Sequence, residues 1–122
     1  MPRVLVDACG WVAVVDGGIH IDHALADQVG PVELAVTASG RAELERLQGE
    51  RSTSLLLDLL DERAEVVEAP EGTRHTDDQL IQLASQLQCP VLTVDRELKR
   101  RLAESGAGII EVVGSSTLRL VR

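Results

Sequence analysis

The chain has 122 residues, of which 20 are acidic and 12 basic, and its formal net charge is −8. This length suits one domain that buries its own core, and the acidic balance argues against broad, nonspecific binding of nucleic acids. No apolar run approaches the roughly 18 residues of a membrane span, and the opening MPRVLVDACGW lacks the form of a signal peptide. The expectation is a single cytoplasmic domain over residues 1–122, with no membrane contact.

Five short apolar runs, rich in Val, Ile and Leu, are bounded by turn residues or charges, as buried strands are. They are VLVDA (4–8), ELAVT (33–37), AEVVEA (64–69), PVLTVD (90–95) and GIIEVV (108–113). The tail, SSTLRLVR (115–122), fits either a last edge strand or a short appendage.

Helical patterns lie between these runs. They are HALADQV (23–29), GRAELERL (40–47), TSLLLDLLDERA (53–64), DDQLIQLASQLQ (77–88) and RELKRRLAES (96–105). Thr76 and Gln79 have the spacing of a capping box at the start of the fourth pattern. Strands that alternate with helices predict an α/β fold with parallel pairing and right-handed crossovers. We therefore expect three layers, α/β/α, around a mainly parallel five-stranded sheet.

Two residue types limit the chemistry. Cys9 and Cys89 lack the paired spacing of a zinc or redox motif, so we expect free thiols. Trp11 is the only aromatic residue among Phe, Trp and Tyr, so base stacking on aromatic side chains is nearly unavailable.

Acids follow two strands that should be neighbours. With a strand order of 3-2-1-4-5, the first and fourth strands adjoin where the order reverses, which is where open parallel sheets bind ligands. Asp7 ends the first run and Asp95 ends the fourth. Neighbouring strands lie roughly 4.8 Å apart, so the two carboxylates would nearly touch and repel each other. A divalent cation, Mg²⁺ or Mn²⁺, is a common remedy.

Each acid also has a simpler explanation. Asp95 could cap the helix that begins at the next residue. Glu43 could be a solvated helix residue paired with Arg46. Asp77 and Asp78 lie in the first turn of a helix, where the macrodipole favours acids.

Asp7 is harder to explain in this way. Apolar residues flank it on both sides, so it is expected to be buried and to need a partner. Together with one acid from positions 43 or 45, one from 77 or 78, and Asp95, it would form a dense negative cluster beyond the strands.

Four stretches of the chain resemble those of PIN domains. They are the strand-ending Asp7, RAELERL (41–47), TDDQLIQLA (76–84) and LTVDRELKRRL (92–102). The last is the most specific, since it has Thr-x-Asp followed three places later by an apolar residue, Leu98. The resemblance runs from VLVDA to GIIEV and is closest to archaeal stand-alone members related to ribosome-maturation nucleases and VapC-type toxins. It implies a metal-dependent endoribonuclease that hydrolyses phosphodiester bonds with one or two Mg²⁺ or Mn²⁺ ions.

The resemblance implies four catalytic and metal-binding acids. They are Asp7, Glu43, Asp77 and Asp95, with Glu43 matching better than Glu45. It also implies four residues that either bind the metal in addition or hold the metal-binding acids in place. They are Asp78, Thr93, Cys9 and Glu97. Two positions depart from the family pattern: Cys9 stands where Ser, Thr or Asn is usual, and Val94 where Asn is frequent.

The resemblance also implies partners. RNA would be the substrate, a homodimer is frequent in such families, and the toxin branch would add an antitoxin protein. Four basic residues directly after Asp95 could hold the RNA backbone, although bases near a helix C-terminus are equally expected on a solvated face. These residues are Arg96, Lys99, Arg100 and Arg101.

Two other functions remain compatible with the sequence. One is a PIN-like module that binds RNA or protein without turnover, for which Cys9 and Val94 are the best evidence. The other is aspartyl-phosphate chemistry on a similar sheet. A phosphatase of the haloacid dehalogenase type expects an Asp where Cys9 stands, and a receiver domain expects a Lys at a late strand end, whereas Lys99 is in a predicted helix. No dinucleotide or P-loop motif is present.

Overall fold

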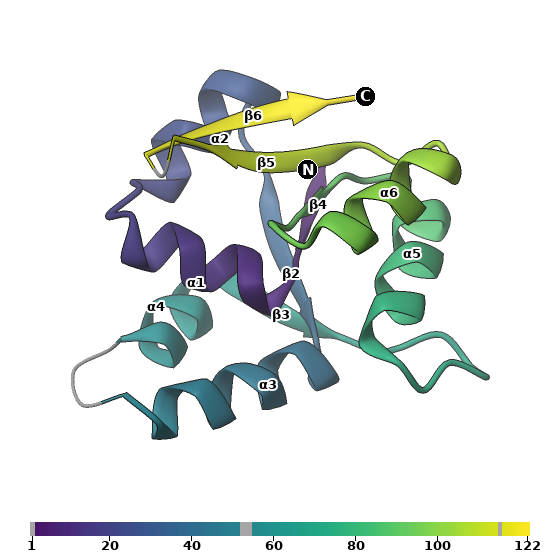
Figure 1. Cartoon of the computed structure of the whole chain (residues 1–122), viewed down its shortest axis with the longest axis horizontal. Helices are drawn as coiled ribbons and strands as arrows, with labels where there is room; N and C mark the ends of the chain where they lie inside the picture. The colour runs from purple at the N-terminus through teal and green to yellow at the C-terminus, as the bar shows by residue number, and fades with distance from the viewer. Residues whose placement is uncertain (1, 52–54, 115) are drawn as a thin grey trace.

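A six-stranded sheet lies at the centre of the molecule (Figure 1). The structure is a computed structural model that describes residues 2–51, 55–114 and 116–122. Its strands are β1 (Arg3–Val6), β2 (Glu33–Thr37), β3 (Ala64–Val67), β4 (Val91–Leu92), β5 (Ile109–Val113) and β6 (Thr117–Val121). The order is β3-β2-β1-β4-β5-β6, and the pairs among β1 to β5 are parallel. The predicted α/β fold and the order 3-2-1-4-5 are therefore confirmed.

Helices connect these strands. In the described part of the chain they are α1 (Ala8–Asp16), α2 (Ile21–Val29), α3 (Ala38–Gly49), α4 (Leu56–Arg63), α5 (Thr76–Leu87) and α6 (Arg96–Glu104). The last five match the predicted segments with shifted ends, and positions 53 and 54 of one predicted segment lie outside the described residues. Helix α1 was not predicted, because its sequence, ACGWVAVVD, is apolar on nearly all sides and shows no distinct helical face. Among the described residues, no helix is both long and apolar enough to cross a bilayer.

The sheet has one strand more than the five that were predicted. The tail forms β6, which pairs antiparallel with β5 and buries Leu118. The backbone N–H of Leu120 donates to the side-chain oxygen of Gln28 at 2.8 Å, and this bond fixes β6 to α2. The tail is thus an edge strand and not an appendage.

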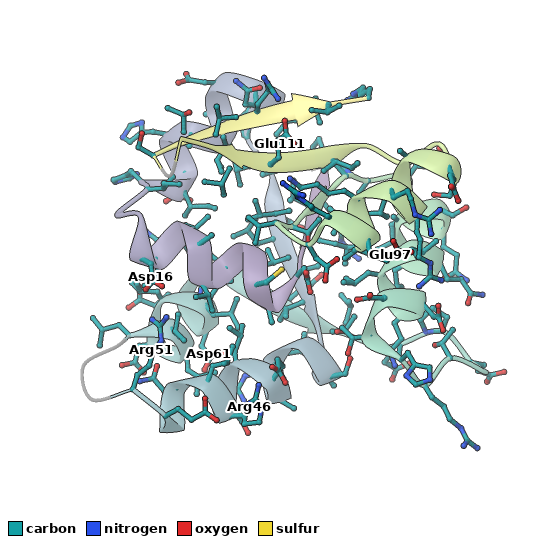
Figure 2. The ribbon with its side chains drawn as sticks, in the orientation of Figure 1. Asp16, Arg46, Arg51, Asp61, Glu97 and Glu111 are labelled. Atoms are coloured by element: carbon teal, nitrogen blue, oxygen red, sulfur yellow. The ribbon has the colours of Figure 1, made fainter. Side chains whose placement is uncertain are left out.

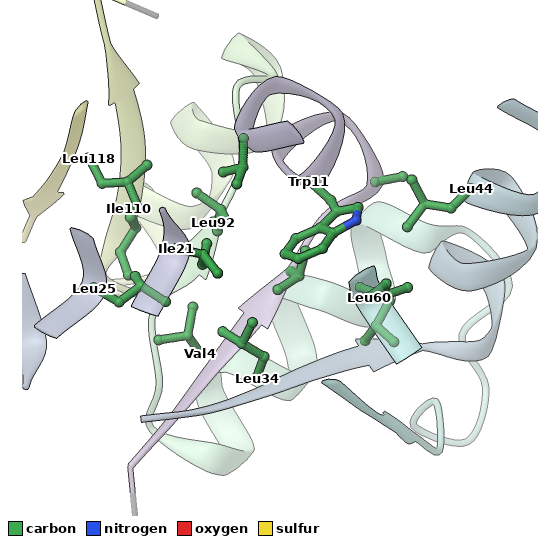
Figure 3. Close-up of a cluster of buried hydrophobic side chains, with 14 of the residues drawn as sticks. Val4, Trp11, Ile21, Leu25, Leu34, Leu44, Leu60, Leu92, Ile110 and Leu118 are labelled. Carbon is green, nitrogen blue, oxygen red and sulfur yellow. The ribbon is translucent and has the colours of Figure 1, made fainter. Parts of the chain in front are cut away.

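Side chains from the two faces of the sheet form two separate cores. Val4 and Val6 of β1 pack with residues of α1, α2, α3 and α4, whereas Leu5 packs with residues of α5 and α6. This alternation follows from the period of two along a strand and gives the predicted three layers. Figure 3 shows the larger core, in which Trp11 lies near Leu60. The Trp11 indole N–H donates to the Leu56 carbonyl at 2.9 Å, so the ring is buried without losing its hydrogen bond.

Helix α1 crosses β4 at very close range. A Cβ atom added at Gly10 would lie 2.5 Å from the carbonyl oxygen of Leu92 and 3.0 Å from Cα of Thr93. Both neighbours are backbone atoms, which cannot move aside as a flexible side chain can. Gly10 therefore allows the helix that follows Asp7 to pack directly against the end of β4.

Gly10→Ala is expected to destabilise the protein by about 1–3 kcal/mol, the usual cost of overpacking a core. The matched control is Gly49→Ala in α3, where an added Cβ has open space and stability should be unchanged or slightly higher. Urea unfolding measures both changes. If the two variants had equal stability, the contact between α1 and β4 would be looser than described.

Candidate active site

The register between β1 and β4 brings Asp7 and Thr93 together. Leu5 pairs with Val91 and Val6 with Leu92, so the next residue on each strand is Asp7 and Thr93. The Thr93 hydroxyl, which is fully buried, donates to Oδ2 of Asp7 at 2.7 Å. The expectation that Asp7 and Asp95 would be directly adjacent is therefore wrong in detail, because β4 ends at Leu92 and Thr93 occupies the neighbouring place.

Asp7 is buried, as its apolar surroundings predicted. Its side chain is 8% exposed, and its Oδ2 also accepts a hydrogen bond from the Cys9 thiol at 2.8 Å. Burial, followed by the nearby Asp7 carboxylate, raises the pKa of the Cys9 thiol, which keeps the sulfur protonated and able to donate. The Cys9 thiol thus donates a hydrogen bond to the same carboxylate oxygen as Thr93 does. Both cysteines are free thiols, as expected.

Asp95 caps the helix that follows it. Its Oδ1 accepts a hydrogen bond from the backbone N–H of Leu98 at 2.9 Å, and its own N–H donates to the Thr93 hydroxyl oxygen at 3.1 Å. The simpler explanation of Asp95 as an N-cap is therefore confirmed. Within the described residues, hydrogen bonds reach one carboxylate oxygen of Asp95 and one of Asp7. The cap therefore leaves the second oxygen of Asp95 able to bind a ligand.

Asp77 completes a group of three acids at this edge of the sheet. It lies in the first turn of α5, and its pKa is raised, first by burial and then by the charges of Asp7 and Asp95. Asp78 behaves differently, since its hydrogen bond to Arg101 at 2.5 Å lowers its pKa. Of the two neighbouring acids, Asp77 is therefore the one that senses the charges of the other strand-end acids.

Glu43 is engaged elsewhere in this structure. It lies on α3, and its carboxylate forms an ion pair with Arg46 one turn further on, at 2.5 Å (Figure 2 labels Arg46). This pair is the simpler explanation given above for Glu43. Glu45 pairs with Arg41. A role for Glu43 as a fourth ligand stays a prediction, and it requires the side chain to leave Arg46.

Ion pairs engage most of the basic residues of α6. Arg100 binds Glu97 and Glu104 on its own helix, so Glu97 serves this pair (Figure 2 labels Glu97). Lys99 reaches Glu111 on β5 at 3.2 Å. Arg101 contacts α5, and Arg96 is exposed. Contact of these side chains with RNA remains a prediction, and each pair would have to open or share its charge.

A polar network under the site was not anticipated from the sequence. The Ser39 hydroxyl at the start of α3 donates to Oε1 of Gln79 at 2.6 Å, and it lies 3.1 Å from the Thr37 hydroxyl. Gln79 is 6% exposed, two residues after Asp77, and its amide lies 3.5 Å from the Thr73 carbonyl. Because a buried amide needs partners, this network holds the start of α5 against α3.

The predicted capping box at the start of α5 is wrong. His75 occupies the N-cap position without a side-chain cap, and Thr76 is already helical. The side chain of Gln79 turns to Ser39 instead of reaching back along its own helix. In the sequence, Gln79 lies on the same helix face as the apolar residues Leu80 and Leu83. A polar residue on a buried face was the sequence feature that could have predicted this tertiary contact.

The acids have the donor chemistry of a site for a hard divalent cation. Asp7, Asp77 and Asp95 supply carboxylate oxygens, which suit Mg²⁺ or Mn²⁺, and their mutual repulsion would be relieved by such an ion. Among the described residues, no three His, Cys, Asp or Glu side chains are already spaced to share a metal ion. The residue types therefore fit, and the carboxylates must turn toward one another to bind a cation.

Asp77→Asn is expected to stabilise the metal-free protein at pH 7. Because its pKa is raised in the folded protein, an ionised Asp77 destabilises the fold at pH values above that folded-state pKa. Below the pKa of the unfolded chain, near 3.8, Asp77 is protonated in both states and the destabilisation disappears. The gain from Asn should therefore shrink as the pH falls from 7 toward about 4. Urea unfolding in the presence of a chelator measures this change.

The matched control for this experiment is Asp78→Asn, which should have the opposite sign. The lowered pKa of Asp78 means that its charge stabilises the fold above its unfolded pKa, so the Asn variant should lose stability at pH 7. Changes of the same sign in both variants would contradict the placement of Asp77 opposite the other acids.

Known proteins share the fold of this chain. A search of curated proteins finds no match. Among solved structures, the PIN domain endonuclease Utp24 superposes with a TM-score of 0.78 at 23% identity, over 98% of this chain and 91% of that one. A PilT N-terminus domain protein from the archaeon Sulfolobus solfataricus superposes with a TM-score of 0.59 at 12% identity, over 89% and 86% of the two chains. These two likenesses establish the fold, and the family model for PIN-like domains matches residues 4–115. The chain belongs to the PIN-like domain family.

Proposed function

We propose that this protein is a metal-dependent endoribonuclease whose active site is formed by Asp7, Asp77 and Asp95. The observation that carries the proposal is the placement of these three carboxylates near the point where the strand order reverses. Burial, followed by the charges of Asp7 and Asp95, raises the pKa of Asp77, which agrees with this placement. Family membership supports the assignment. The printed description of the similar structure Utp24 as an endonuclease supports it further.

The proposed reaction is hydrolysis of a phosphodiester bond. Asp7, Asp77 and Asp95 would hold one or two Mg²⁺ or Mn²⁺ ions, with Glu43 as a fourth ligand or as the group that orients the water. Such ions supply a water with a lowered pKa and offset charge that develops on the phosphate. The buried Thr93 hydroxyl and the Cys9 thiol fix the orientation of Asp7, so one carboxylate is positioned before any ligand arrives.

The proposal that the substrate is RNA rests on the family resemblance. The net charge of −8 disfavours general attraction to a polyanion, so contact must come from local bases and from bound cations. Arg96, Lys99, Arg100 and Arg101 follow Asp95 and are the nearest candidates along the chain. A second copy of the chain and, for a toxin, an antitoxin protein are further proposed partners.

Asp7→Asn and Asp95→Asn are each expected to abolish Mn²⁺-dependent cleavage of a labelled single-stranded RNA while the protein stays folded. Loss of a residue that hydrogen-bonds to a metal ligand typically lowers metal affinity or activity by roughly 10–100-fold. Loss of the ligand itself should lower the activity by at least as much. Asp16→Asn is the control, because Asp16 is exposed and pairs with Arg51 at the far end of α1 (Figure 2).

Two results would count against this proposal. Undiminished cleavage by either variant would remove the acids from the reaction. A wild-type protein that binds RNA but shows no cleavage at any Mn²⁺ or Mg²⁺ concentration would favour the binding module without turnover.

Glu43→Gln is expected to reduce cleavage much more than Glu45→Gln. The two residues are separated by about 200° around a helix of 3.6 residues per turn, so they cannot both face the site. Both carboxylates form surface ion pairs within α3, which makes Glu45→Gln a matched control for the loss of such a pair. Initial rates at saturating Mn²⁺ provide the comparison. Equal rates would show that Glu43 stays with Arg46 and takes no part.

A further inference from the structure

Arg101 is the basic residue of α6 that reaches across to the helix carrying Asp77. Its guanidinium Nη2 donates to Oδ1 of Asp78 at 2.5 Å, and Asp78 directly follows Asp77 in the first turn of α5. Helices α5 and α6 contribute to the same core, on the same face of the sheet. The packing of two helices thus delivers a positive charge to the edge of the acid group.

The charge of Arg101 lies near Asp77 as well as its direct partner, because Asp77 and Asp78 are adjacent in the first turn of α5. Asp7, Asp95 and Asp78 all disfavour a negative charge on Asp77, whereas Arg101 favours it. Arg101 in turn senses both Asp78 and Asp77. Its side chain is 37% exposed, so the guanidinium lies at the protein surface and not in the core.

The neighbouring bases of α6 do not share this placement. Arg100 binds Glu97 and Glu104, both on its own helix. Lys99 binds Glu111 of β5, on the other side of α6 from α5. Arg100 and Arg101 therefore carry the same charge on adjacent positions of one helix, but only the second, among these three bases, is directed to the acids.

We propose that Arg101, held by Asp78, is the internal counter-cation of the three acids and lowers the affinity of the site for divalent cations. This inference deepens the proposed function, on which it rests, by naming a residue that regulates metal binding at the same site. A fixed positive charge beside the carboxylates repels an incoming cation and partly relieves the repulsion that would otherwise favour binding. The guanidinium also suits a phosphate oxygen, so an RNA phosphate could draw it away from Asp78 and remove this opposition.

The test compares Arg101→Met with Arg100→Met in calorimetric titrations of the metal-free protein with MnCl₂. Both variants remove one positive charge from the same helix and keep an unbranched side chain of similar length. Arg101→Met should bind Mn²⁺ about three- to fivefold more tightly than the wild type, in line with a partly exposed charge interaction. Arg100→Met should stay within about twofold, because its charge is directed to Glu97 and Glu104.

Three further measurements sharpen the result. Arg101→Lys keeps the charge without the planar fork, so it should retain the wild-type affinity if charge is the cause. Raising the salt concentration should shrink the difference between Arg101→Met and the wild type, because exposed charges are screened. The shift in melting temperature with MnCl₂ gives an independent readout that does not depend on cleavage.

The outcomes separate this inference from the proposed function. If the wild type binds Mn²⁺ and Arg101→Met binds it no more tightly than Arg100→Met does, the counter-cation role is wrong and the nuclease proposal stands. If Arg101→Lys matches Arg101→Met, a packing effect replaces the charge explanation, which also overturns the inference. If the wild type binds no Mn²⁺ and cleaves no RNA, both proposals fail together.

Discussion

The buried hydroxyl of Thr93 is the contact on which the geometry of the candidate site depends. It donates to the carboxylate of Asp7 on β1 and accepts from the backbone N–H of Asp95 at the start of α6. One side chain therefore links two acids that the chain order separates by 88 positions. Because Thr93 is fully buried, the loss of this hydroxyl would leave Asp7 with only the Cys9 thiol as a donor and would remove the partner of the Asp95 N–H.

The same edge of the sheet shows how local stability and function share residues. Asp95 caps α6 with one oxygen, and Asp7 receives its hydrogen bonds on one oxygen. Capping and metal binding are thus compatible uses of one carboxylate, because each needs a different oxygen. The cost of the arrangement falls on Asp77, whose charge is opposed by burial and by both other acids. Repulsion of this kind, which Arg101 offsets in part, is typical of candidate functional sites.

Ion pairs limit which charges are available to a ligand. Glu43 is held by Arg46 and Arg100 by two acids of its own helix, so neither faces the site in this structure. Arg101 differs because its partner, Asp78, adjoins Asp77. An acidic protein with net charge −8 can act on a polyanion only through such local positive charges and bound cations. The proposed competition between Arg101 and a metal ion at this acid group would give a physical basis for regulating the site.

The sequence by itself determined the α/β fold and the burial of Asp7, which follow from strand and helix periodicity and from apolar neighbours. The strand order 3-2-1-4-5 was a premise of the sequence analysis that the structure confirms. The sequence also predicted that Asp7, one acid from positions 43 or 45, one from 77 or 78, and Asp95 would gather beyond the strands. The structure places Asp77 within the influence of Asp7 and Asp95 and pairs Glu43 with Arg46. The tertiary structure decided what periodicity cannot encode. The register of β1 against β4 placed Thr93, and not Asp95, beside Asp7. Contacts between helices paired Gln79 with Ser39 and Arg101 with Asp78. These choices depend on side chains distant along the chain, whose distances are set only when the helices pack against the sheet.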